Sequence, residues 1–93
     1  MNIPTITNLD TALRIYYSNS ELDNKSIIEL FGQRISSATI SKLKKVVKDE
    51  MSRQNIMSYG LNRINTALAY ETWGIDVVDL EKRRKKLKDL NLQ

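Results

Sequence analysis

Small polar and basic side chains are concentrated between residues 34 and 48, with a spacing that suits one face of a helix. A helix turns by about 100° per residue, so a stripe of apolar residues at Ile40, Leu43 and Val47 defines the inward side. The opposite side then presents Ala38, Ser41, Lys42 and Lys45. Lysine and serine donate hydrogen bonds to phosphate oxygens and base edges, and alanine permits close approach. This face therefore has the chemistry of a polyanion-binding surface.

Four further residues extend this candidate surface. Ser36 lies at the leading end of the helix, where it can cap the helix or meet a base edge. Arg34 in the preceding turn, with Lys44 and Lys48 beside the face, is expected to contact phosphates. The full candidate set is Arg34, Ser36, Ala38, Ser41, Lys42, Lys44, Lys45 and Lys48. The competing interpretation is that Ser36 is only a cap and the lysines only a solvated face.

Catalytic chemistry is not indicated anywhere in the chain. The sequence has no cysteine and no histidine, which excludes thiolate nucleophiles, the usual zinc ligand sets and histidine acid–base catalysis. Asp76 is explained as a helix cap and Asp79 by the helix dipole, and no nucleophile or glycine-rich phosphate loop accompanies them. We therefore expect a non-enzymatic protein with no catalytic residues, no metal, no cofactor and no small-molecule substrate.

The net charge of +4 is unevenly distributed along the chain. Residues 33–63 carry seven basic and two acidic side chains, and residues 82–93 carry six and one. Residues 64–81 between them carry four acidic side chains and no basic one. Such blocks indicate either a polyanionic partner or a partner with complementary blocks.

Capping residues and apolar spacing predict five helices. The expected ranges are 9–17, 25–31, 37–57 with fraying after Arg53, 62–73, and 77–90. The expected N-caps are Thr7 or Asn8, Asp23 or Asn24, Ser36, and Asp76. Gly32 and Gly74 are expected to end the second and fourth helices, because glycine readily adopts the left-handed conformation found there.

Strand signals are weak throughout. No stretch alternates cleanly over about five residues and no Asn-Gly or Asp-Gly turn occurs, so an antiparallel wing after the third helix is not expected. The 93 residues contain no low-complexity linker, which predicts a single all-α domain over residues 1–93, a compact bundle of about five helices. Tyr70 and Trp73 lie in the acidic segment and are assigned to the core.

The segment 24–48 resembles helix-turn-helix DNA-binding domains. In that family a bracing helix buries apolar residues just before a glycine turn, an apolar residue follows the turn, and two more lie three apart in the recognition helix. This sequence supplies Ile27, Ile28 and Phe31, then Gly32, then Ile35, then Ile40 and Leu43. The match covers about a quarter of the chain. Gln33 and Arg34 lengthen the tight form of the turn by two residues. This extension is expected to change the angle between the two helices or to shift the DNA-contacting positions by one residue.

The basic run 82–88 has three interpretations. The first is a phosphate-contacting arm in which Arg83 and Lys86 make the contacts. The second is the polar side of a dimer helix, and the third is a patch resembling a nuclear-import signal. Val77, Leu80, Leu87 and Leu90 form an apolar edge that Arg84 interrupts, so a long coiled coil is not expected. Pairing of this helix with a second copy, giving a homodimer, stays open.

The resemblance implies sequence-specific binding of duplex DNA. The expected role is transcription regulation. Size and basic blocks are also similar to those of small DNA-binding proteins of bacteriophages and mobile elements, a group that includes recombination accessory proteins and the DNA-recognition subunits of packaging terminases. The alternative is a non-enzymatic helical module for protein–protein interaction or oligomerisation. No apolar run approaches the roughly 20 residues of a membrane span, and residues 1–10 lack the features of a signal peptide. A cytoplasmic location without a membrane partner is therefore expected.

Overall fold

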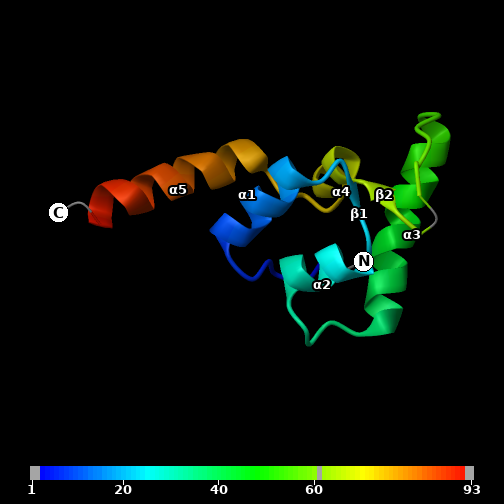
Figure 1. Cartoon of the computed structure of the whole chain (residues 1–93), viewed down its shortest axis with the longest axis horizontal. Coiled ribbons are helices and arrows are strands. Elements are labelled where there is room, and N and C mark those ends of the chain that lie inside the picture. The colour runs from blue at the N-terminus through cyan, green and yellow to red at the C-terminus, as the bar shows by residue number, and fades with distance from the viewer. Residues whose placement is uncertain (1–2, 61, 92–93) are drawn as a thin grey trace.

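Five helices and two very short strands make up the part of the chain that the structure describes, residues 3–60 and 62–91 (Figure 1). The structure is a computed structural model. Its elements, in chain order, are α1 (Leu9–Ser18), β1 (Glu21–Leu22), α2 (Asn24–Phe31), α3 (Ser37–Arg53), β2 (Ile64–Asn65), α4 (Thr66–Thr72) and α5 (Val77–Asn91). The expectation of a mainly helical chain with five helices is confirmed, and the domain that was expected to be all-α also contains a small two-stranded sheet.

The predicted starts of α1, α2, α3 and α5 are confirmed by their capping bonds. The side-chain oxygen of Asn8 accepts a hydrogen bond from the backbone N–H of Thr11 at 2.7 Å, which begins α1. Asp23 caps α2, and Ser36 caps α3. The Asp76 carboxylate accepts from the N–H of Asp79 at 3.2 Å and begins α5. Each cap satisfies a donor that the first helical turn leaves unpaired.

α3 does not continue to residue 57 and stops at the position where fraying was expected. The helix ends at Arg53 because Asn55 adopts a left-handed conformation, with φ at 56°. The N–H of Ile56 then bonds to the carbonyl of Met51 at 2.8 Å, and that of Asn55 to Ser52 at 3.3 Å. This pair of bonds is a Schellman motif with asparagine in the place usually held by glycine. Gly74, with φ at 74°, ends α4 in the same way.

The two strands join segments that flank α2 and α3. Leu22 pairs with Ile64, and Glu21 with Asn65, in an antiparallel ladder. Two residues per strand are too few to produce a visible alternation of polar and apolar residues. Because Ile64 and Asn65 belong to β2, α4 begins at Thr66 and not at residue 62 as expected. The Asn65 side chain then caps α4 by accepting from the N–H of Leu68 at 2.9 Å.

The core draws one apolar face from every helix. The most deeply buried large side chains are Leu13, Ile15, Leu22, Ile27, Leu30, Leu43, Val47, Ile64 and Tyr70. The Tyr70 hydroxyl donates to the carbonyl of Ala12 at 2.6 Å, and the Trp73 indole N–H donates to the carbonyl of Leu43 at 3.2 Å. Both aromatic residues therefore lie in the core as predicted, with their polar atoms paired.

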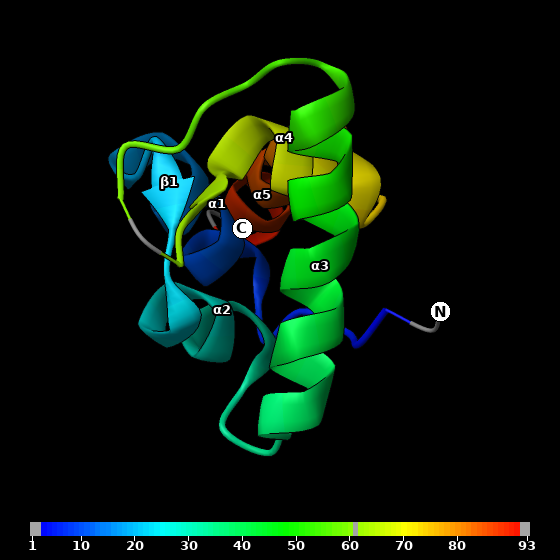
Figure 2. The same cartoon turned by 90° about the vertical axis from the view of Figure 1, so that its right-hand side faces the viewer.

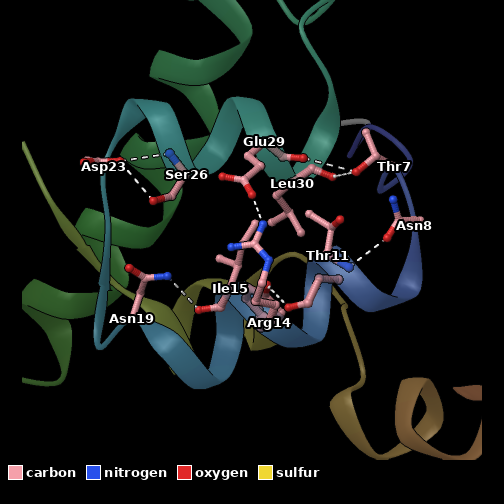
Figure 3. Close-up of polar contacts among 12 residues, drawn as sticks. Thr7, Asn8, Thr11, Arg14, Ile15, Asn19, Asp23, Ser26, Glu29 and Leu30 are labelled. Atoms are coloured by element: carbon pink, nitrogen blue, oxygen red, sulfur yellow. Dashed lines mark hydrogen bonds and ion pairs between the residues drawn. The ribbon is translucent and has the colours of Figure 1, made fainter.

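Polar contacts fix α2 against α1 (Figure 3). Arg14 on α1 forms an ion pair with Glu29 on α2. At the other end of the contact, the Thr7 hydroxyl lies 3.1 Å from the carbonyl oxygens of both Glu29 and Leu30. The Thr7 N–H also donates to the Leu30 carbonyl at 2.9 Å. The residues before α1 thus occupy carbonyls that the end of α2 would otherwise leave unpaired.

The two basic helices lie at opposite ends of the molecule. Figure 1 shows α3 at one end and the last turns of α5 extending from the other, and in Figure 2 α3 faces the viewer with α5 behind it. The Cα radius of gyration is 14.0 Å. A chain of this length packed evenly has a radius near ~12 Å, and the projecting α5 accounts for the difference. Among the described residues, no helix has the length and apolar character needed to cross a membrane.

Candidate nucleic-acid interface

The outward face of α3 carries the side chains that the helical spacing predicted. Ile40, Leu43 and Val47 are buried, and α3 packs through them on α2 and α4. On the other side, exposed positions are Ala38, Ser41, Lys42, Lys45 and Lys48. The predicted inward and outward faces are therefore confirmed for these residues. α3 lies along the edge of the molecule (Figure 2).

The turn between α2 and α3 also follows the expected pattern. Gly32 has φ at 100°, a conformation that favours glycine, and its N–H bonds to the Ile28 carbonyl and closes α2. Ile35 is half-buried and packs against the core, while Arg34 is exposed. The turn therefore places Arg34 in solvent beside the beginning of α3.

Ser36 is occupied as a helix cap. Its hydroxyl oxygen accepts from the backbone N–H of Thr39 at 3.1 Å and lies 2.9 Å from the Thr39 hydroxyl. The interpretation of Ser36 as a cap is confirmed, and the side chain is still exposed. A contact between Ser36 and a base edge stays a prediction.

The expectation that Lys44 lies beside the exposed face is wrong. Its side chain is only 7% exposed. The ammonium group donates to the Asn24 side-chain oxygen at 2.9 Å and to the Asn62 carbonyl. Position 44 is one full turn after Ile40, about 40° from it on the wheel, and so belongs to the inward half. Burial lowers the pKa of Lys44, repulsion from Lys48 lowers it further, and Asp23 opposes both.

Lys44 instead has a positioning role among three segments. Its bonds join α3 to the first residue of α2 and to the segment that precedes β2. A buried lysine stem with a paired ammonium both packs and fixes geometry. It is therefore not retained as a candidate phosphate contact.

An acidic residue on the same face was missed. Asp49 is exposed one turn beyond Lys45 and forms an ion pair with it at 3.3 Å. Such an exposed pair contributes little to stability, but its carboxylate repels phosphate. The exposed face of α3 is therefore most strongly basic over its first half, around Lys42.

A second missed residue lies beside α3. Arg63 lines a surface hollow together with Lys48 and Tyr59, whose side chain is 96% exposed. Arg63 also contributes to the lowered pKa of Asp23, although the main cause is the hydrogen bond from the Ser26 N–H. Arg63 was missed because a helix was expected over residues 62–73. In the structure Ile64 belongs to a strand, and the residues just before it lie beside α3.

The two candidate phosphate contacts on α5 are not near this surface. Arg83 and Lys86 are both exposed, and Arg83 is paired with Asp79 at 2.8 Å. α5 extends from the end of the molecule opposite to α3 (Figure 1). The structure therefore separates the two basic blocks.

Groups that would bind a metal are not assembled in the described ranges, where no three acidic side chains come close enough to share an ion. The remaining candidate surface consists of the turn, the outward face of α3 and the adjacent Lys48 and Arg63. The chain matches no protein-family model, no curated protein and no solved structure.

Proposed function

We propose that the protein binds duplex DNA by placing the first half of α3 in a major groove, with α2 as the bracing helix of a helix-turn-helix. The observation that carries this proposal is the division of α3 into an anchored side and an exposed basic side. Leu43 and Val47 hold the helix in the core, while Lys42 and Lys45 lie in solvent. A helix held in this way can enter a groove without exposing the core.

The small residues of α3 suit contact with bases. The major groove is about 12 Å wide and accepts one helix only where its side chains allow close approach. Ala38 and Ser41 are small and exposed on the outward side. Lys42, on the other side of Ala38 from Ser41, can donate to a guanine or to a phosphate. These three residues are the proposed source of sequence preference.

The surrounding cations suit contact with the DNA backbone. Arg34 precedes the helix, Lys45 follows the base-reading positions, and Lys48 with Arg63 lies to one side. Phosphate contacts of this kind fix the orientation of a protein on a duplex and supply most of its affinity. Arg83 and Lys86 are not part of the proposed surface, because α5 lies at the other end of the molecule (Figure 1).

Transcription regulation is the biological role that we propose for this binding. A small chain that combines a groove-binding helix with nearby phosphate contacts can occupy a site and exclude other proteins from it. No catalytic constellation is proposed.

A salt titration tests the proposal. Binding of the full chain to a fluorescently labelled duplex of mixed sequence is followed by anisotropy at several salt concentrations. With three to five phosphate contacts, a plot of log affinity against log salt should be linear with a slope of about −3 to −5. An absence of binding at the lowest salt concentration would overturn the proposal.

A further inference from the structure

The last two turns of α5 form an unpartnered basic and apolar surface. Leu80 is buried against the rest of the fold. Arg84 forms an ion pair with Asp10 of α1 at 3.6 Å, the last ion pair between α5 and the other described elements. Beyond that point Leu87 is 53% exposed and Leu90 is 64% exposed. At 1.5 Å per residue, the part of α5 after Arg84 extends by roughly 10 Å. Figure 1 shows this part projecting from the molecule.

Leu87 and Leu90 lie near the same side of α5 as Leu80. Leu87 is seven residues after Leu80 and Leu90 three residues further, spacings that keep all three within one side of a helix. The apolar side of α5 thus continues beyond the last position at which α5 contacts the rest of the fold. Lys86 flanks the exposed leucines, while Lys82 and Lys85 lie on the opposite side of the helix.

A matching hollow lies between α1, α4 and the beginning of α5. It has a volume of about 450 Å³, and its apolar lining includes Tyr16, Ala67, Ile75 and the exposed Val78. Glu71 and Asp76 stand at its edge and are exposed. Within the described residues, neither carboxylate takes part in an ion pair. The hollow therefore offers apolar surface with an acidic rim.

The end of α5 has the complementary character. It presents two leucines beside Lys86, whereas the part of the hollow's lining that the structure describes includes Glu71 and Asp76 and no basic side chain. A basic amphipathic helix is the occupant that such a surface fits, because apolar burial and charge pairing then act together. Lys86, with no ion pair among the described residues, is placed to meet the rim.

The two surfaces cannot meet within one molecule. Val77 and Val78 are at the start of α5, and Leu87 and Leu90 are nine to thirteen residues later on the same continuous helix. That separation is about 14–20 Å along a rigid element. The occupant of the hollow must therefore come from another molecule.

We infer that the hollow binds the C-terminal end of α5 from a second copy of this chain. Val78 in the hollow and Leu87 near the end of α5 are nine residues apart, which is half a turn of the helix, so the two surfaces face opposite sides of α5 and the contact between copies runs head to tail. Docking of one two-turn segment buries less than the roughly 1,000 Å² of a stable interface, so this self-association is weak and reversible. This inference does not depend on DNA binding, and its test uses no DNA.

Sedimentation equilibrium of the full chain without DNA tests the inference. The wild type should show reversible self-association that increases with concentration, and Leu87→Glu should weaken it by at least about tenfold. Circular dichroism should show unchanged helix content, because Leu87 is exposed. Lys85→Glu is the matched control, since Lys85 lies on the side of α5 opposite to Leu87 and its change should leave the self-association intact. A wild type that stays monomeric up to near-millimolar concentration would overturn the inference.

A charge exchange identifies the two surfaces as partners. Lys86→Glu and Glu71→Lys should each weaken self-association, because each variant brings like charges together at the contact between copies. Mixed in equal amounts, the two variants should associate again, because contacts between unlike copies pair opposite charges. If the mixture associates no more strongly than either variant alone, Lys86 and Glu71 do not face each other and the inference is wrong.

Discussion

Lys44→Ala should destabilise the fold strongly, although lysine substitutions in solvent usually do not. The change removes three methylene groups from a side chain that is only 7% exposed, which costs about 2 kcal/mol at ~0.8 kcal/mol each. It also removes the charged hydrogen bond to Asn24, worth about 1.5 kcal/mol or more. Relief of the buried charge offsets part of this loss. The expected net loss is therefore about 3 kcal/mol of unfolding free energy.

Urea unfolding followed by circular dichroism measures this loss, and thermal unfolding should show a melting temperature lower by roughly 10–25 °C. Lys45→Ala is the matched control, because the neighbouring lysine is exposed and should change stability by about 0.5 kcal/mol or less. Lys44→Met, which keeps the stem, should fall between the two. Equal effects of Lys44→Ala and Lys45→Ala would refute the assignment of Lys44 to the interior.

Three further predictions concern the same fold. Leu43→Ala should cost about 2–5 kcal/mol in urea unfolding, and a loss below 1 kcal/mol would contradict its core position. Gly74→Ala meets no atom within 4 Å but must adopt φ at 74°, so it should cost about 1–2 kcal/mol and Gly74→Asn less. Because burial lowers the folded-state pKa of Lys44, its contribution to stability should rise with pH between that lowered pKa and 10.5. Burial raises the pKa of Tyr70, so the contribution of Tyr70 to stability falls above pH 10. The effect of Lys44 is therefore measured as the difference in unfolding free energy between wild type and Lys44→Met. This difference should increase with pH.

Local signals were sufficient to predict the starts of α1, α2, α3 and α5 and the glycine that ends α2. A cap involves residues three apart, and the structure uses Asn8, Asp23 and Ser36 as expected. Gly32 and Gly74 end their helices because both need a positive φ. These features depend on neighbours in the sequence, which is why a single chain reveals them.

Features that depend on distant contacts were missed. The pairing of Leu22 with Ile64 joins residues far apart in the chain, and two-residue strands leave no period in the sequence. Asn55 ends α3 although asparagine adopts the left-handed conformation less often than glycine does.

The candidate site was predicted in the same uneven way. Helical spacing placed Ala38, Ser41 and Lys42 correctly on the outward side, because a wheel describes the centre of a face well. Lys44 was expected beside that face although it lies only about 40° from Ile40 on the wheel, and its ammonium group is held by Asn24 and by the segment before β2. Arg63 was missed because its position depends on the strand pairing.

The most direct test of the proposed function compares the salt dependence of DNA affinity between two double variants. Lys42→Ala with Lys45→Ala and Lys82→Ala with Lys85→Ala remove the same charge from opposite ends of the molecule (Figure 1). The first variant should bind mixed-sequence duplex more weakly, with a log–log salt slope reduced by about 2, while the second keeps the wild-type slope. Equal losses of slope in the two variants would contradict the assignment of α3 as the DNA-binding surface.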